Sequence, residues 1–293
     1  DYEKWAKEIS GVTKAYCVPI GQGLGTVDVI ILADPNTTDD EIPSSSARIG
    51  VTTSVTANKL VDSTATFQTA HAVAEGDIVE NPLRQTQATV TAVDSTTELS
   101  LDADIFLFAG DPYIVHCQTG TNASVTAGKL IDSAGIFDNA TYTVKPGDIV
   151  KNVTDNLQTT VVTVDSATQL TLTTDIFTVT GKKYVIYGLI GLVKAYIDPL
   201  RPVTASKVSI LPPTILEENV EMTVVGTGLD ATAIAAGITA YMNTMIPGQT
   251  LYMAKLIQLA MEAGADNVTL TTPAADVTAT AYEMIRPGVI SVS

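Results

Sequence analysis

The sequence predicts an α+β core domain, with helices on a mixed sheet, split by an insertion of two tandem small all-β modules of barrel or sandwich type. The first observation is a duplication: SVTANKLVDSTATF begins at Ser54 and SVTAGKLIDSAGIF at Ser124, which is typical of a tandem array. The second is that the flanking segments mix helical and strand patterns, as in α+β proteins. The third is that 45% of the 293 residues are hydrophobic and 16% are charged, which is sufficient for packed cores.

The segment before the duplication reads as a short helix followed by a hairpin. Apolar residues of Asp1–Ile9 recur at helical spacing, and Gly11 ends the helix. Val12–Ile20 and Thr26–Ala33 are the two predicted strands. The glycine-spaced loop between them, Gly21–Gly25, would suit a phosphate only if a helix followed it. A strand follows, so we predict a hairpin turn.

A polar connector, Asp34–Ser46, leads from the hairpin to the duplication. It carries an acidic cluster of Asp39, Asp40 and Glu41. The cluster lacks the alternating oxygen-ligand spacing of a calcium loop. We therefore predict a solvated loop or the first turn of a helix, and no metal site.

The two modules are assigned to residues 53–117 and 118–187. Each is predicted to contain short strands, a Gly-Asp turn, two alternating strands around an Asp-Ser turn, and a last strand that carries a tyrosine. The repeated apolar residues predict a core: Leu60/Leu130, Phe67/Phe137, Ile78/Ile149, Val93/Val164, Leu99/Leu170 and Ile105/Ile176. The repeated aspartates predict turns and not metal ligands: Asp62/Asp132, Asp77/Asp148 and Asp94/Asp165.

The segment after the duplication returns to mixed helix and strand. The predicted helices are Leu189–Ile197, which Pro199 ends, a helix from Asp230 to about Thr244, and Leu251–Ala263. The predicted strands are Ser206–Leu211, Asn219–Gly226, Asn267–Thr271, Ala281–Ile285 and Val289–Val292. Residues 1–52 and 188–293 together are predicted to form the split core domain.

The net charge of −16 repels phosphate backbones and anionic lipid surfaces, so neither nucleic acid nor membrane is a predicted partner. No apolar run reaches the roughly 18 residues of a membrane span. The two cysteines, Cys17 and Cys117, are predicted to be buried reduced thiols that form no disulfide. The opening residues, DYEKWAKEIS, resemble no signal peptide and contain no Met, so we expect a fragment or a processed product.

No catalytic, cofactor-binding or metal-ligating residue is predicted. Both histidines, His71 and His116, lie in the first module, and the second module has Tyr187 at the position of His116. A Ser-His-Asp or Cys-His arrangement needs a positioned base, so a histidine that the sister module lacks is interpreted as incidental. Clusters of His and Cys at metal-ligand spacing are absent from the sequence. Because acidic residues are numerous, a pair of carboxylates for glycoside hydrolysis remains an open alternative. We nevertheless predict no enzyme and no cofactor.

Several phrases in the flanks occur in an order that resembles one family. The run EISGVTKAYCVPIGQGLGTVDVIILAD and the later run AYIDPLRPVTASKVSILPPTILEENVEMTVV are similar to the core domain of the baseplate J-like family of contractile-tailed phages. The matching phrases are RPVTA at Arg201–Ala205, IPGQTL at Ile246–Leu251, and the segment Gly264–Val268. The resemblance covers roughly residues 1–50 and 188–293. The chain departs from the family pattern in its two inserted modules and in lacking the family's usual N-terminal part.

The resemblance implies a structural role without chemistry. Members of this family are wedge components of the baseplate ring in contractile tails and related injection machines. The resemblance therefore implies contacts with further copies of the chain, with other wedge proteins and with the central hub. It also implies a place in the tail of the virion after assembly in the bacterial cytoplasm.

The modules are expected to brace a neighbouring subunit or decorate the particle. The alternative is an adhesin-type module that binds a surface or a glycan. Aromatic side chains that could stack on sugars are few and are better explained as core. They are Phe106, Phe108 and Tyr113 in the first module, and Tyr142, Phe177 and Tyr184 in the second.

Overall fold

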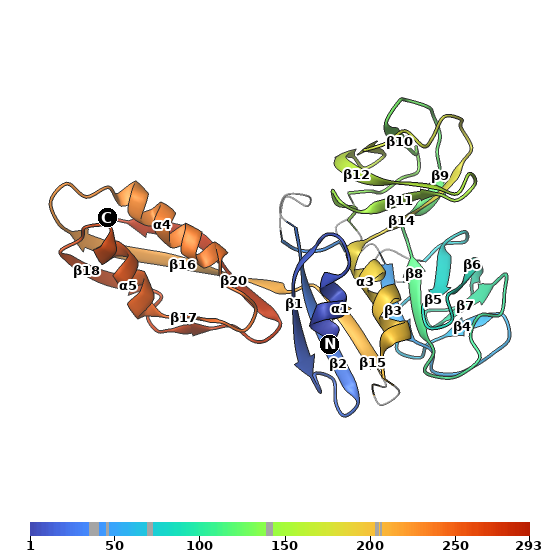
Figure 1. The fold of residues 1–293 in the computed structure, drawn as a ribbon, viewed down its shortest axis with the longest axis horizontal. Helices are drawn as coiled ribbons and strands as arrows, with labels where there is room; N and C mark the ends of the chain where they lie inside the picture. The colour runs from blue at the N-terminus through green and yellow to red at the C-terminus, as the bar shows by residue number, and fades with distance from the viewer. Residues whose placement is uncertain (35–40, 45–46, 69–72, 139–142, 203–204, 206) are drawn as a thin grey trace. The chain divides into compact units, whose positions relative to one another are not determined.

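The computed structural model describes residues 1–34, 41–44, 47–68, 73–138, 143–202, 205 and 207–293 (Figure 1). The chain divides into two compact units, Asp1–Pro212 and Pro213–Ser293. The protein is mainly β-sheet with a few helices. Within the described residues, no helix is both long enough and apolar enough to cross a lipid bilayer.

A three-stranded mixed sheet combines segments that lie far apart in the sequence. β1 (Val12–Pro19) and β2 (Thr26–Ala33) form the predicted antiparallel hairpin, and β15 (Lys207–Leu211) pairs with β2 in parallel. The central strand β2 is buried from Asp28 to Ala33. A strand that is covered on both faces needs apolar side chains on both, which explains why this segment reads as a nearly continuous apolar run.

Two helices pack against this sheet. α1 (Tyr2–Lys7) and α3 (Leu189–Ile197) lie in front of it in Figure 1, and a 3-10 turn, η1 (Asp198–Leu200), follows α3. Gly11, with φ +95°, takes the chain from α1 into β1. The core under the helices is formed by both chain segments and contains Ala6, Ala15, Val29, Ile31, Ala33, Leu189, Ile190, Val193, Ile197, Ala205, Val208 and Ile210.

Each copy of the duplication folds into a six-stranded antiparallel sheet. The first has the order β3-β8-β5-β6-β7-β4 and the second the order β10-β13-β12-β11-β14-β9. The strands of the first are β3 (Ala47–Val51), β4 (Lys59–Val61), β5 (Ile78–Asn81), β6 (Thr86–Val93), β7 (Glu98–Leu101) and β8 (Pro112–His116). Those of the second are β9 (Thr119–Thr121), β10 (Lys129–Ile131), β11 (Ile149–Asn152), β12 (Leu157–Ser166), β13 (Gln169–Leu172) and β14 (Lys183–Tyr187).

A single bridge links the two ends of each sheet. Ser54 bridges Val61 in the first module, and Ser124 bridges Ile131 in the second. These serines follow β3 and β9, while their partners lie on β4 and β10, so each bridge connects the outermost strands. Each module is therefore a small barrel, which is one of the two predicted alternatives.

The first module begins earlier than predicted, whereas the second begins with β9, close to the predicted residue 118. β3, which was assigned to the core, pairs with β8 so that Gly50 lies opposite Tyr113. β9 pairs with β14 so that Gly120 lies opposite Tyr184. The first module's sheet therefore starts at Ala47 and not at residue 53. The paired segments share little besides this glycine, so only the strand pairing reveals that they are equivalent.

The repeated apolar residues line the barrel interiors, with one exception. The two clusters include Leu60/Leu130, Phe67/Phe137, Leu99/Leu170 and Ile105/Ile176, with Val93/Val164 packed at their margins. Ile78 and Ile149 are only partly buried, whereas Val79 and Val150 are fully buried. Successive side chains of a strand point to opposite faces. The prediction that Ile78 and Ile149 belong to the core is therefore wrong, because the valine that follows each of them faces the barrel interior.

The unit Pro213–Ser293 has a hydrophobic core of its own. A sheet of order β18-β16-β20 packs against α4 and α5, next to a small two-stranded ribbon. The elements are β16 (Thr214–Val225), α4 (Ala231–Asn243), β17 (Thr250–Leu251), α5 (Met253–Glu262), β18 (Asn267–Thr272), β19 (Val277–Thr278) and β20 (Glu283–Val292). The carboxylate of Asp230 caps α4 as predicted, accepting the backbone N–H groups of Thr232 and Ala233 at 2.9 and 3.1 Å.

Two predictions about this region differ from the structure. The core domain was expected to include all of residues 188–293, but the residues after Pro212 form the separate unit. The last strand was expected to break at Pro287-Gly288, but β20 is continuous. β20 is an edge strand, and proline is tolerated in edge strands. The register of β20 against β16 shifts at Pro287-Gly288, where the backbone N–H of Val289 donates to Asn219 Oδ1 at 2.7 Å.

Candidate functional site: the junction of the two β modules

A buried hydrogen bond between an aspartate and a tyrosine recurs in both barrels. Tyr113 Oη donates to Asp62 Oδ2 and Tyr184 Oη to Asp132 Oδ2, each at 2.8 Å. Asp62 Oδ1 also accepts the backbone N–H of Thr64, and Asp132 Oδ1 that of Ala134, both at 2.9 Å. These aspartates therefore shape turns as predicted, and they also fix the tyrosine of the last strand.

The aspartates of the Gly-Asp turns join the modules to their neighbours. One carboxylate oxygen of each accepts a backbone N–H in its own turn, from Ala74 to Asp77 and from Lys145 to Asp148, at 2.9 Å. The other oxygen of Asp77 accepts the hydroxyl of Thr119, in the first strand of the second module, at 2.7 Å. These carboxylates thus hold both a turn and a junction, and the sequence predicted only the turn.

Asp148 makes the junction with the helical part of the unit. Ser44 Oγ, in the connector, donates to Asp148 Oδ1 at 2.7 Å and accepts the backbone N–H of Leu189 at 3.1 Å. Lys145 Nζ donates to the carbonyl oxygen of Ile42 at 2.8 Å. The connector, the second module and the start of α3 are therefore linked through one buried serine.

The stability of this junction should depend on pH. Burial raises the pKa of Asp148 to about 7, and hydrogen bonds from Lys145 and Ser44 and the charge of Lys145 oppose the rise only in part. An unfolded aspartate titrates near 3.9, so between about pH 4 and 7 the folded state binds the extra proton. The contribution of Asp148 to stability is therefore most favourable at low pH and is lost as pH rises through 7, by about 2 kcal/mol between pH 5.5 and 8.5.

The check is urea unfolding at pH 5.5 and 8.5, with hydrogen exchange of residues 145–150 as a local readout. Asp148→Asn keeps the shape without the titration, so the variant should lose this part of the pH dependence. An unchanged dependence in Asp148→Asn would show that another group causes it.

A cleft of about 320 Å³ separates the two modules, and its lining comes from equivalent positions in both. The side chains form three pairs across the duplication: Glu80/Lys151, Gln87/Gln158 and His116/Tyr187. Ile149 of the second module and Gly191, Leu192 and Ala195 of α3 complete the lining. The modules therefore face each other through the same three strands, and two of the three paired positions carry different residue types.

His116 is the most buried polar group of this cleft. Its side chain is 1% exposed, its Nε2 lies 3.1 Å from Glu80 Oε2, and its ring meets that of Tyr187 edge-on at 4.6 Å between centroids. His116 Nδ1 has no hydrogen-bond partner among the described residues. The described lining includes no serine or cysteine that this imidazole could activate. The arrangement suits contact between modules better than nucleophilic chemistry.

Other residues considered in the sequence are scattered. Gly21–Gly25 forms the hairpin turn between β1 and β2, with positive φ at Gly23 and Gly25. Both cysteines are free thiols, but Cys17 is only partly buried. No group of three His, Cys, Asp or Glu side chains that could hold a metal occurs in the described part of the chain. His71, Asp39, Asp40 and Tyr142 lie outside the described residues.

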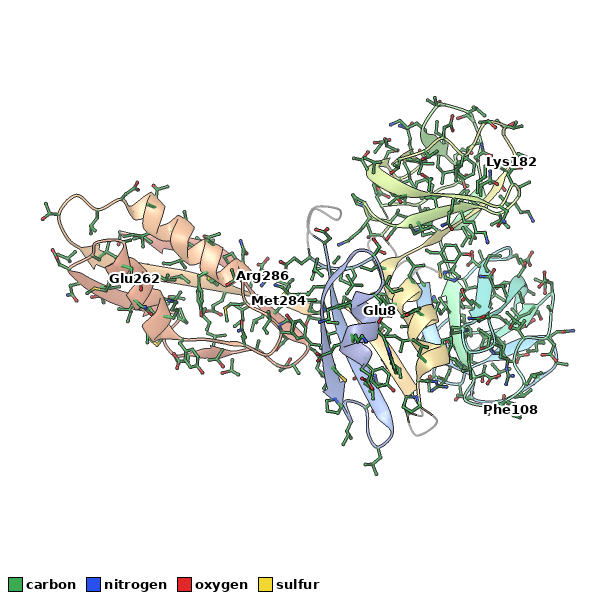
Figure 2. The ribbon with its side chains drawn as sticks, viewed as in Figure 1. Glu8, Phe108, Lys182, Glu262, Met284 and Arg286 are labelled. Carbon is green, nitrogen blue, oxygen red and sulfur yellow. The ribbon has the colours of Figure 1, made fainter. Side chains whose placement is uncertain are left out.

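The aromatic residues of the modules divide into a buried majority and one exposed ring. Phe106, Tyr113, Phe177 and Tyr184 are core residues, between 0% and 3% exposed. Phe108, which was expected in the core, is 65% exposed and lies at the edge of the first module in Figure 2. The guanidinium of Arg84 sits 5.2 Å from its ring centroid. Because Phe108 lies in the loop before β8, no strand turns it inward.

A buried ion pair between α3 and the first residue of η1 was not predicted. Lys194 Nζ lies 2.6 Å from Asp198 Oδ2, and the two side chains are 4% and 0% exposed. Burial lowers the pKa of Lys194 and raises that of Asp198, and their mutual attraction opposes both shifts. The i,i+4 spacing in KAYID was the available sequence signal, but it cannot show which face of the helix is buried.

Comparison with known proteins gives one match that runs from the N-terminal flank into the first module and one match in the C-terminal unit. Residues 1–69 match the model of the baseplate J-like central domain, and residues 219–293 match that of the baseplate J-like protein C-terminal domain. A segment of 34 residues is 53% identical to the baseplate protein gp47 of Escherichia phage Mu. That segment spans 12% of this chain and 9% of the length of the Mu protein.

Proposed function

We propose that this chain, which belongs to the baseplate J-like family, is a non-enzymatic structural component of a phage tail baseplate. The observation that carries the proposal is the presence of both baseplate J-like domains in one chain, in the expected order. The acidic surface agrees with a role in assembling proteins and not in binding nucleic acid.

The finer proposal places the chain in the wedge of a contractile tail or related injection machine. It would contact further copies of itself, other wedge proteins and the hub, and it would enter the virion after assembly in the bacterial cytoplasm. The resemblance of the flanks to the family core supports this placement. Deleting the gene in the phage or prophage that encodes it should give tails without baseplates, and the intact gene should restore them. Particles with complete baseplates that lack the protein would exclude this role.

We further propose that the two barrels are an insertion that braces a neighbouring subunit. Support comes from Ser44, before the first barrel, whose Oγ accepts the N–H of Leu189, after the second, at 3.1 Å. The ends of the inserted segment therefore lie next to each other, as a removable domain requires. The sugar-stacking alternative finds little support, since four of the aromatic residues considered for it are buried.

Removing residues 47–187 should therefore leave a cooperatively folded protein. The mixed sheet and the core between α1, α3 and β2 use no strand from the barrels, although Ile49 packs at the margin of this core. Joining the chain through a short Gly-Ser linker keeps the two ends in reach. Cooperative thermal unfolding is expected both for the joined core and for the unit Pro213–Ser293, and an insoluble or molten product would contradict the insertion. Binding of the isolated barrels to a glycan array would favour the adhesin alternative.

A further inference from the structure

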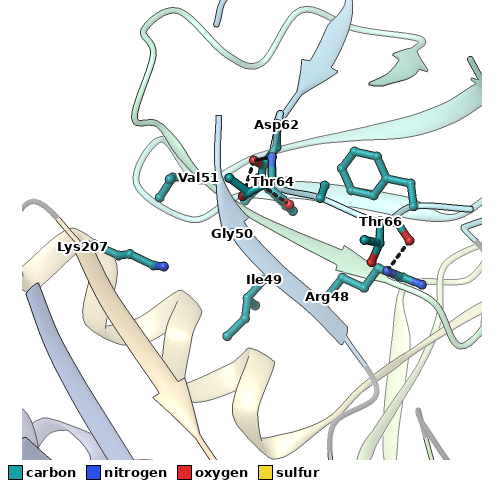
Figure 3. Close-up of a pocket in the computed structure, with 11 residues that line it drawn as sticks. Arg48, Ile49, Gly50, Val51, Asp62, Thr64, Thr66 and Lys207 are labelled. Carbon is teal, nitrogen blue, oxygen red and sulfur yellow. Dashed lines mark hydrogen bonds between the residues drawn. The ribbon is translucent and has the colours of Figure 1, made fainter. Parts of the chain in front are cut away.

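A groove lies between two edge strands of the first unit. β15 is the outermost strand of the mixed sheet, and β3 is the first strand in the order of the first barrel. Two cavities of about 350 and 160 Å³ share the lining residues Ile49, Gly50, Val51 and Lys207, so they adjoin along these strands. Figure 3 shows the side chain of Lys207 reaching from β15 toward β3.

The groove is basic although the chain as a whole is acidic. Arg48 and Lys207 line the larger cavity, and Lys207 also lines the smaller one, where its Nζ donates to Gln22 Oε1 at 2.7 Å. Lys194 lines the smaller cavity as well, but its charge is paired with that of Asp198. Asp62 is the one carboxylate among the lining residues, and it accepts hydrogen bonds from Tyr113 Oη and from the backbone and side chain of Thr64. Neutral donors satisfy this carboxylate, and the two cations Arg48 and Lys207 outnumber it, so the lining is net positive.

The second barrel provides an internal comparison. Arg48 Nη1 donates to the carbonyl of Thr66 at 3.0 Å, and Gln118 Nε2, at the equivalent position, donates to the carbonyl of Ile136 at 3.2 Å. The same hydrogen bond is thus made by a charged side chain in one barrel and a neutral one in the other. Because the glutamine is sufficient for the bond, holding the turn does not explain the positive charge of Arg48.

We infer that this groove binds an extended acidic segment of a partner protein, which adds a strand along the open edge of β15 and faces β3. An edge strand offers backbone groups to such a segment, and pockets for alternate side chains give selectivity. β3 and β15 are five residues long each, about 16 Å of strand. Carboxylates on alternate residues of the segment would face Lys207 and Arg48. The inference concerns the chain alone and holds whether or not the particle is a baseplate.

A random library of twelve-residue peptides displayed on yeast, selected against the full chain, tests this site. Enriched peptides should alternate Asp or Glu with β-branched residues. A synthetic copy of the best one should bind Lys207→Glu about tenfold more weakly than the unaltered chain. The same peptide should slow hydrogen exchange at residues 47–51 and 207–211. Lys14→Glu is the matched control, because it makes the same charge change on β1, at the opposite edge of the same sheet, and should bind normally.

Four results would overturn the inference: no enrichment, enrichment without acidic residues, equal binding by Lys207→Glu, or protection elsewhere in the chain. Self-association that Lys207→Glu abolishes would show that a second copy, and not another protein, occupies the groove. Thermal unfolding confirms that each variant is folded, and Lys207→Gln replaces Lys207→Glu if the latter is not.

Discussion

Phe137→Ala should lower the free energy of unfolding of the second barrel by about 3–5 kcal/mol. The ring is fully buried and packs 6.0 Å from that of Tyr184 between centroids. The cluster around it is small and is enclosed by short strands, so the barrel has little freedom to collapse into the space left by the ring. A loss of this size is a large fraction of the total stability of a small domain.

Hydrogen exchange resolved by segment measures the effect, because it reports on the strands β10–β14 separately from the rest of the chain. Phe67→Ala makes the same change in the first barrel, where the ring is 1% exposed, and should affect only that barrel. Phe108→Ala is the matched control: its ring is 65% exposed, and the cost should stay within about 0.5 kcal/mol. A comparable loss in Phe108→Ala would show that burial does not set the cost.

Gly120→Ala should destabilise the same barrel by about 2–4 kcal/mol, through overpacking and a broken buried hydrogen bond. A Cβ at this position would lie 2.6 Å from Tyr184 Oη and would also overlap Asp132 Oδ2. Both atoms belong to the buried Tyr184–Asp132 hydrogen bond, so neither can move without leaving the carboxylate unsatisfied. Gly50→Ala should behave alike, because its Cβ would lie 2.5 Å from Tyr113 Oη.

A double-mutant cycle isolates the cause. Tyr184→Phe alone removes the donor to Asp132 and should cost about 1–3 kcal/mol. Combined with Gly120→Ala it also removes one of the two clashing polar atoms, Tyr184 Oη, while Asp132 Oδ2 stays, so the two losses should not add fully. Gly237→Ala is the control for glycine replacement as such: no atom lies within 4 Å of its Cβ in α4, and the variant should be more stable by up to about 1 kcal/mol. Strictly additive losses would mean that the hydroxyl is not the obstacle.

The duplication and most elements could be predicted because local pattern determines them. The hairpin β1–β2, the cap at Asp230 and the Gly-Asp and Asp-Ser turns depend on spacing and turn chemistry within about ten residues. The candidate site could not be predicted in the same way. Asp77 and Asp148 were predicted to shape turns. The second carboxylate oxygen of each bonds a distant residue: Thr119 lies 42 positions from Asp77, and Ser44 lies 104 positions from Asp148. His116 was interpreted as incidental because the second repeat has Tyr187 at the equivalent position. Comparing the two repeats shows this difference, but it does not show that the two side chains face each other in the folded protein.

The sequence by itself predicted two tandem small all-β modules, of barrel or sandwich type, between helix-and-sheet flanks, and its phrases pointed to the baseplate J-like family. Only the tertiary structure decided where the first barrel begins, because β3 is defined by its pairing with β8. It also separated Pro213–Ser293 as a unit with its own core. The physical reason is that strand partners and core boundaries depend on contacts between residues distant in sequence, and alternation within one segment does not specify them.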